Sequence, residues 1–193
     1  MEQNIRNTIA DTISGFHMPR LDDIPGVGLY LEQTVSYINE YLSPILDGAV
    51  TGSMISNYVK KKMVSNPVRK QYSREQIASL SFIAVTKSVL SLDNIRVLLA
   101  IRDARYKDRT AYNYFCGELE SVLRLVFGLD EADDALTAAE MSKADEPTES
   151  DPRLAEEKEI LQNTVIAVAH KIYLDKWILQ YAVCDNRRGG KIE

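Results

Sequence analysis

The chain has 193 residues, of which 45% are hydrophobic and 26% are charged, so it is long enough for a real core and is neither a disordered nor a fibrous sequence. Its formal charge is −5, no apolar run approaches the ~20 residues of a membrane span, and no signal-like segment follows Met1, so we expect a soluble cytoplasmic protein. Two distant cysteines and two histidines argue against a disulfide framework or a zinc site, and we expect no metal and no cofactor.

Charge is distributed unevenly along the chain. Residues 130–159 hold twelve acidic and three basic residues, whereas six lysines and arginines, and no acidic residue, lie between Asp47 and Glu75. A local basic patch matters more than net charge for binding a polyanion, because exposed charges are screened beyond ~10 Å. The basic stretch is therefore either a solvated face or a binding surface.

Helix patterns dominate from the N-terminus onward. Residues 1–15 carry isoleucines at helical spacing, and the sequence leaves open whether this segment docks as a helix or stays loose. A helix over residues 29–42 follows, since Leu31, Val35, Ile38 and Leu42 fall on one face.

A short helix is predicted from Thr51, a good N-cap, to about Lys62. Small polar groups gather on the side of this helix away from Ile55, and among them is Asn57, a mediocre helix former that can donate to and accept from a base edge. The alternative is an ordinary surface helix. The polar side comprises Ser53, Ser56, Asn57 and Lys60.

The next elements are a loop or small β-ribbon over residues 64–72 and a helix opened by a capping box of Ser73 and Gln76. That helix is apolar on more than one side, so we expect it to be central. Another helix starts at residues 91–93.

Two helices are predicted in the second half. One covers residues 111–127 and stops at Gly128. The acidic, proline-punctuated segment 131–152 is typical of a linker, and one long helix follows over residues 153–183. Its apolar surface is wide enough to need cover both from the 111–127 helix and from a second subunit. One predicted stripe comprises Leu161, Val165, Val168 and Ile172; the adjacent one comprises Ile166, Ala169, Tyr173 and Trp177.

The middle of the chain carries four motifs: ISNYVKKKMV over residues 55–64, PVR over 67–69, YSREQIASLSFI over 72–83 and LSLDNIRVLL over 90–99. Together they resemble the winged helix-turn-helix of MerR-type transcription regulators. The resemblance implies a recognition helix and wing that include Tyr58, Arg69 and Tyr72. Lys62 stands where that family usually has a turn glycine. Residues 16–101, opening with FHMPR, resemble the YkrK-like family of unknown function, number 1836 in the domain-of-unknown-function series.

The predicted fold is all-α, with a MerR-like winged helix-turn-helix domain, a minimal β wing and additional C-terminal helices. The predicted parts are a segment 1–15, the domain 16–105, a packing helix 106–130, the acidic linker 131–152 and the long helix with its tail, 153–193.

The leading hypothesis is a non-enzymatic DNA-binding transcription regulator that binds double-stranded DNA, with a homodimer formed through the C-terminal helices and a palindromic site. Base edges would be read by Ser53, Ser56 and Asn57. The phosphate contacts would come from Lys60, Lys61, Arg69, Lys70 and Arg74, with Tyr58 and Tyr72 completing the interface.

The alternative is a protein-interaction or ligand-sensing helical module that keeps the winged-helix shape without specific DNA binding. Aromatic residues of the last two helices could line a ligand pocket, although aromatics at helical spacing more often form plain core. The pocket candidates are Tyr112, Phe115, Tyr173 and Trp177. No arrangement of a nucleophile with a base indicates an enzyme.

Overall fold

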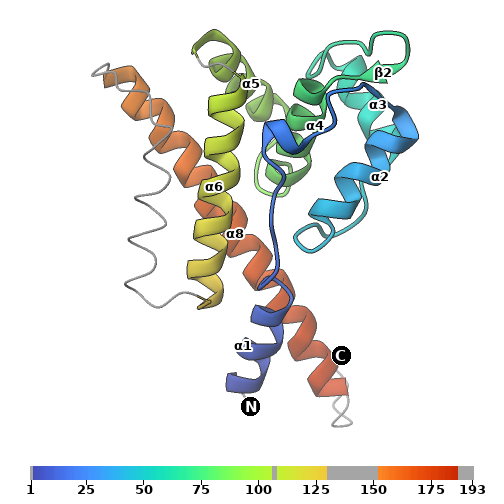
Figure 1. Cartoon of the computed structure of the whole chain (residues 1–193). Helices are drawn as coiled ribbons and strands as arrows, with labels where there is room; N and C mark the ends of the chain where they lie inside the picture. The colour runs from blue at the N-terminus through green and yellow to red at the C-terminus, as the bar shows by residue number, and fades with distance from the viewer. Residues whose placement is uncertain (1, 106–107, 130–151, 187–193) are drawn as a thin grey trace.

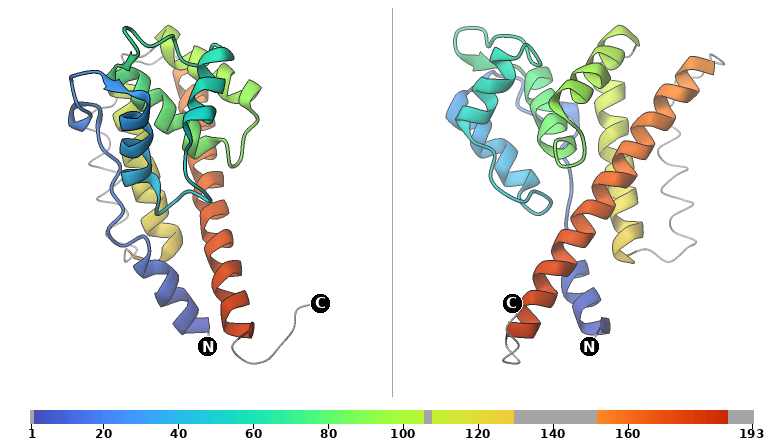
Figure 2. Two further views of the ribbon diagram at one scale, coloured as in Figure 1. Left: turned by 90° about the vertical axis from the view of Figure 1, so that its right-hand side faces the viewer. Right: turned by 180° about the vertical axis from the view of Figure 1, so that it is seen from behind.

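The computed structural model describes residues 2–105, 108–129 and 152–186 (Figures 1 and 2). This part of the chain forms seven α-helices, one short 3₁₀ helix and a two-stranded sheet, which confirms the all-α prediction. The predicted acidic linker lies outside the described residues, except for Pro152, which begins a helix. In chain order the elements are α1 Glu2–Asp11, η1 Leu21–Asp23, β1 Leu29–Tyr30, α2 Leu31–Leu42, α3 Gly52–Lys60, β2 Gln71–Tyr72, α4 Arg74–Thr86, α5 Leu92–Arg105, α6 Asp108–Phe127 and α8 Pro152–Asn186.

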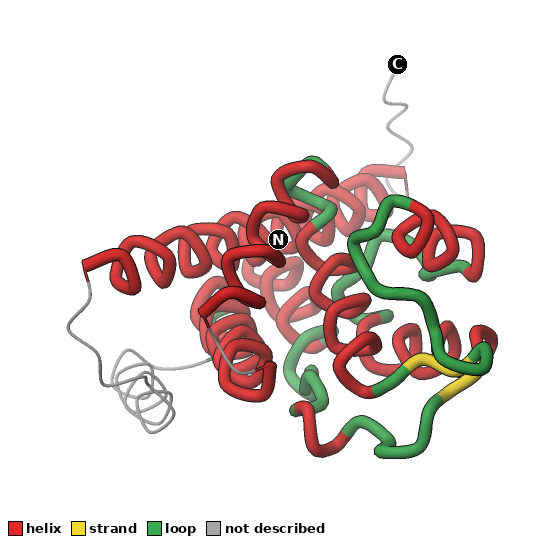
Figure 3. Tube along the Cα trace, turned by 90° about the horizontal axis from the view of Figure 1, so that it is seen from above, coloured by secondary structure: helices red, strands yellow, loops and turns green. Residues whose placement is uncertain are grey.

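The two-stranded sheet is formed by segments that are far apart in sequence. Leu29 pairs antiparallel with Tyr72, and Tyr30 pairs with Gln71. The prediction of helix from residue 29 is therefore wrong by two residues, because the first two belong to a strand and α2 begins at Leu31. The sheet lies at the edge of the helical body (Figure 3).

Helix α4 is the central helix, as predicted. Every residue from Gln76 to Thr86 is buried, since α2, α5, α6 and α8 all pack around it. The predicted capping box is confirmed: the Ser73 hydroxyl accepts from the Gln76 N–H at 3.3 Å, and the Gln76 side-chain oxygen accepts from the Ser73 N–H at 2.8 Å. This cap satisfies donors that the first turn would otherwise leave unpaired.

Helices α6 and α8 run side by side in the same direction, and α1 packs on α8 further along (Figures 1 and 2). Helix α6 ends as predicted, with Gly128 in the left-handed region at φ +67°. Ile5, Ile9 and Ile13 are each at most 3% exposed, so the N-terminal segment is docked rather than loose.

The first predicted stripe of α8 holds Val165, Val168 and Ile172 in the core, but Ile166 of the second stripe is 43% exposed. The buried apolar side chains form one continuous core from α1 to α8. None of the described helices combines the length and the apolar character that crossing a membrane would need.

Candidate nucleic-acid interface

Helix α3 is set on the fold by one apolar side. Thr51 caps it as predicted, its hydroxyl accepting from the Met54 N–H at 3.3 Å, and Ile55 is fully buried. The opposite side faces solvent, and it carries the polar residues that the sequence singled out. All four are exposed: Ser53, Ser56, Asn57 and Lys60.

The position of α3 depends on two side-chain amides that sequence reasoning missed. Asn39 of α2 binds both backbone groups of Val50, accepting from its N–H at 2.7 Å and donating to its carbonyl at 2.9 Å. Gln76 of α4 donates to the Ser65 carbonyl at 2.8 Å and to the Asn66 carbonyl at 3.3 Å. These bonds fix the chain just before α3 and just before the hairpin, and no local pattern in the sequence marks either one.

The C-terminal end of α3 is a turn closed around Lys62. The Lys62 N–H donates to the Val59 carbonyl at 2.9 Å, and the Met63 N–H donates to the Tyr58 carbonyl at 3.0 Å. This is a Schellman turn, whose left-handed position is usually a glycine. Here Lys62 occupies that position with φ +56°, which an L-residue adopts only with strain.

A second strained turn forms the tip of the hairpin that leads into β2. The Gln71 N–H donates to the Val68 carbonyl at 2.9 Å, and both residues between them have positive φ, Arg69 at +51° and Lys70 at +67°. Two-residue hairpin turns in which both central residues have positive φ strongly favour the sequence Asn-Gly. Within the described residues, Lys62, Arg69 and Lys70 are the non-glycine residues with positive φ, and all three are basic and exposed.

Helix α3 and the hairpin lie at the same corner of the molecule (Figure 1). We call their exposed polar residues the basic edge. Its lysines and Arg69 make no ion pair with any residue in the part of the chain that the structure describes. The basic edge comprises Ser53, Ser56, Asn57, Lys60, Lys61, Lys62, Arg69 and Lys70.

Acidic groups border the basic edge at two points. Glu32 of α2 lies at the start of α3, with Oε1 3.8 Å from the place that a Cβ on Gly52 would occupy. Arg96 of α5 approaches the Lys61 carbonyl at 3.5 Å while pairing with Asp93 at 3.1 Å. The unbalanced positive charge is therefore concentrated at the C-terminal end of α3 and at the hairpin tip.

Three of the predicted interface residues are not on this surface. Tyr58 and Tyr72 are each only 5% exposed, and desolvation raises the pKa of both hydroxyls. Because both rings pack in the core, we remove them from the interface. Arg74 is held by Asp22 at 3.4 Å and lies against the backbone of Gly26, so it fastens the loop before β1 rather than extending the basic edge.

The four predicted ligand-pocket residues do not converge on one site. Phe115 is 1% exposed and packs edge-on against Phe82, with the ring centroids 4.8 Å apart. Tyr173 packs against Phe127, which lies twelve residues beyond Phe115 on α6, or about 18 Å along the helix. Tyr112 is buried near Phe115, whereas Trp177 stacks on Tyr181 near the end of α8. Tyr112 and Phe115 therefore belong to the core, whereas Tyr173 and Trp177 are partly buried against it elsewhere.

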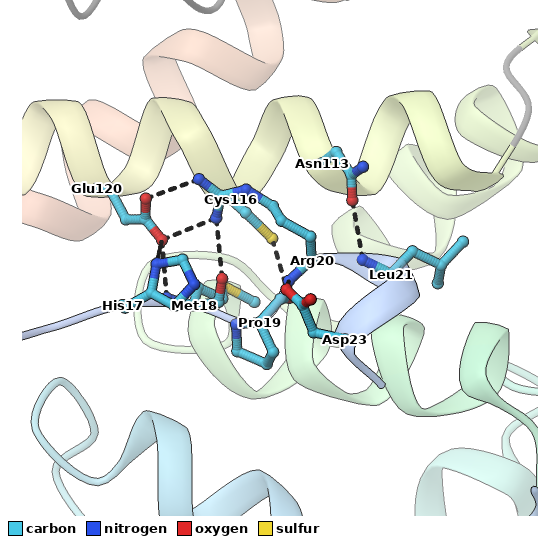
Figure 4. A network of polar contacts seen from close by, with 9 residues as sticks. All are labelled: His17, Met18, Pro19, Arg20, Leu21, Asp23, Asn113, Cys116 and Glu120. Atoms are coloured by element: carbon cyan, nitrogen blue, oxygen red, sulfur yellow. Dashed lines mark hydrogen bonds and ion pairs between the residues drawn. The ribbon is translucent and has the colours of Figure 1, made fainter. Parts of the chain in front are cut away.

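A partly buried polar latch joins the segment after α1 to α6 (Figure 4). The carboxylate of Glu120 accepts hydrogen bonds from the Met18 N–H at 2.7 Å and from both terminal nitrogens of Arg20 at 2.8 and 2.7 Å. Its Oε1 also lies 3.1 Å from Nδ1 of His17. The hydrogen bond to Glu120 raises the pKa of Arg20. Its partners are about a hundred residues apart, which explains why sequence reasoning missed it.

Two further contacts strengthen this latch. Asn113 accepts from the Leu21 N–H at 2.9 Å, and the Cys116 thiol points at the Pro19 carbonyl at 3.8 Å. Burial raises the pKa of Cys116 to about 12, so its sulfur is a small apolar group here rather than a reactive thiol. The latch is structural, since it holds α1 and its connection against α6.

Comparison with known proteins identifies one family. The family model described as "Domain of unknown function (DUF1836)" matches residues 19–115, just over half of the chain. The match runs from the latch segment to the middle of α6 and includes the whole basic edge. No curated protein and no solved structure matches the chain. The chain therefore belongs to the DUF1836 family.

Proposed function

We propose that this protein is a DNA-binding transcription regulator and that the basic edge is its surface for double-stranded DNA. One observation carries the proposal: the cations of the basic edge form no ion pair within the described chain, and three of them are held in a strained backbone. Strained non-glycine residues tend to occur where function constrains the chain. Lys62, Arg69 and Lys70 are such residues.

The dimensions of α3 suit the proposed role. A major groove about 12 Å wide admits an α-helix, and Asn57 could pair with an adenine edge through its amide. Lys60 and Lys61 would then reach phosphates on one side of the groove, and the hairpin tip would reach the neighbouring backbone. Over residues 51–101, α3 is followed by the hairpin and then by α4 and α5, which is the order that the MerR resemblance implies, and we include that likeness in the proposal.

The test compares variants in a titration of labelled duplex DNA at several salt concentrations. Lys60→Ala and Lys61→Ala should weaken binding to all sequences alike and should each reduce the salt slope by about 0.9. Asn57→Ala should cost about 1–3 kcal/mol on the cognate site only. Arg6→Ala, at an exposed position on α1 far from the basic edge, is the matched control and should change nothing.

Two results would contradict the proposal. One is equal loss for Arg6→Ala and Lys60→Ala, which would mean that binding follows net charge alone. The other is an absence of binding even at low salt. If Asn57→Ala lowered the affinity for cognate and random DNA equally, Asn57 would not read a base, and only the proposed phosphate contacts would remain.

A protein-interaction module is the second candidate, and the exposed apolar side of α8 favours it. Salt separates the two candidates, since DNA affinity falls steeply as counterions are released, whereas an apolar helix contact depends little on salt.

A further inference from the structure

Arg96 lies against the C-terminal end of α3, although it belongs to α5 and is not one of the residues that define the basic edge. Its Nη2 lies 3.5 Å from the carbonyl oxygen of Lys61, the C-cap residue of α3, and its Nη1 lies 3.1 Å from Oδ1 of Asp93, three residues earlier on α5. Lys62 follows that carbonyl directly. The guanidinium therefore lies beside the stretch of backbone that carries two exposed lysines of the basic edge.

Arg96 is held loosely, in contrast to the next arginine of the same helix. The Arg96 side chain is 46% exposed and that of Asp93 is 83% exposed, and an exposed ion pair of this kind adds little to stability. Arg102 is only 20% exposed, and it donates to the Ser79 hydroxyl at 3.0 Å as well as to Asp103 at 2.6 Å. Arg102 is therefore part of the packed structure, whereas Arg96 can exchange its carboxylate partner for another anion.

The chemistry of this corner suits a phosphate. A guanidinium has several N–H donors in one plane, and the contacts of Arg96 with Asp93 and Lys61 use only some of them. Guanidinium and phosphate groups often pair through two parallel charge-assisted hydrogen bonds. Lys61 and Lys62 make no ion pair with any of the residues that the structure describes, so three cations stand here against one carboxylate.

We propose that Arg96 binds a backbone phosphate of the same DNA duplex and that Asp93 competes with this phosphate for the guanidinium. The inference rests on the proposed function, because the phosphate belongs to the DNA that α3 binds. In the free protein, Asp93 holds Arg96 beside the end of α3. When DNA binds, a phosphodiester oxygen replaces the carboxylate, and the DNA contact extends from α3 to the first turns of α5. Asp93 thereby limits the affinity, since its charge repels the phosphate.

Arginine variants test the phosphate contact in the titration of labelled duplex DNA at several salt concentrations. Arg96→Ala should reduce the salt slope by about 0.9 and should weaken binding to cognate and random DNA alike, by about 8-fold at 0.1 M salt and about 4-fold at 0.2 M. Arg96→Lys keeps the charge and should keep the slope. If Arg96 were merely structural, Arg96→Ala would lower the stability in urea without changing the salt slope. Arg6→Ala again serves as the control for net charge.

The competition by Asp93 is tested with Asp93→Asn, for which Asp103→Asn is the matched control. Both carboxylates are exposed, lie on α5 and pair with an arginine. Asp103 is ten residues further along α5, or about 15 Å, which exceeds the screening length of about 8–10 Å. Asp93→Asn should raise the affinity for DNA about 2- to 4-fold at 0.1 M salt, which is the effect of a unit charge about 5–8 Å from a phosphate in water. The gain should shrink as salt rises, and Asp103→Asn should leave the affinity unchanged.

Two results would overturn the inference: an unchanged salt slope for Arg96→Ala, or the same change in affinity for Asp93→Asn and Asp103→Asn. Binding that depends on Lys60 and Lys61 but not on Arg96 would overturn only this inference. An absence of DNA binding by the wild type would overturn the proposed function and this inference together.

Discussion

The left-handed lysine at the end of α3 offers a test that separates backbone strain from charge. Lys62 has φ +56° at the position where a Schellman turn favours glycine. Lys62→Gly removes both the strain and the charge. Lys62→Ala removes only the charge, since alanine keeps a Cβ, so the pair of variants isolates each effect.

The magnitude follows from two opposing terms. A left-handed L-residue costs about 1–2 kcal/mol. A glycine at this position avoids that cost, but it lowers the free energy of unfolding by about 0.5–1 kcal/mol because glycine has greater freedom in the unfolded chain. Lys62→Gly should therefore raise the free energy of unfolding by about 0.5–1 kcal/mol, which is on the order of 1–4 °C in Tm for a chain of this size, whereas Lys62→Ala should leave it nearly unchanged.

Urea unfolding and DNA titration on the same samples provide the readout. Both variants should lose the same DNA affinity and about 0.9 of the salt slope, while only Lys62→Gly becomes more stable. The reasoning at Lys62 is refuted if the glycine and alanine variants are equally stable. The converse change, Gly128→Ala at φ +67° with open space around its Cβ, should cost about 1 kcal/mol.

Three further predictions concern the parts that hold the basic edge and the latch. Glu120→Gln weakens the charge-assisted bonds to Arg20 and should lower the free energy of unfolding by about 2–3 kcal/mol in urea, whereas Asn113→Ala, which loses one neutral bond, should lower it by about 1 kcal/mol. Gln76→Ala removes the capping box and the bonds to the 65–66 loop and should lower Tm by an amount corresponding to about 2 kcal/mol in calorimetry. Burial raises the pKa of the Cys116 thiol from 9.0 to about 12. The protonated thiol therefore contributes stability below pH 9, and this contribution is lost as the pH rises toward 12. The Cys116→Ala variant should show a flatter dependence of stability on pH over this range.

Each of these predictions has a result that would contradict it. If Glu120→Gln and Asn113→Ala lowered the free energy of unfolding equally, the charge of Glu120 would add nothing to the stability that the latch provides. Unchanged stability in Gln76→Ala would remove that amide as the support of the hairpin. A thiol titration in which Cys116 reacts as fast as Cys184 in the native protein would contradict its burial.

Local patterns in the sequence were enough to place most helices. Thr51, the box of Ser73 and Gln76, and Gly128 are start and stop signals that act within a few residues, and each lies where it was predicted. The exposed side of α3 also followed from helical periodicity. These features depend on neighbours along the chain, which the sequence displays directly.

The features that sequence reasoning did not predict depend on contacts between residues that are far apart in the sequence. Leu29 and Tyr30 continue a helical pattern but pair with a strand more than forty residues away. The Asn39 amide and the Glu120 latch likewise bind groups that only the folded chain brings near. Tyr58 was assigned to DNA through a resemblance, although its place three residues after Ile55 already matched the buried side of α3.

The measurement that tests the central claim most directly is a selection of fragments of the protein's own genome, at low and near-physiological salt, followed by sequencing of the retained DNA. It is run in parallel with a variant in which Lys60, Lys61, Arg69 and Lys70 are replaced by alanine. The account predicts that the wild type enriches a palindromic site that survives the higher salt and that the variant retains nothing. Retention of the same fragments by both proteins, or of none by either, would contradict the claim that the basic edge binds DNA.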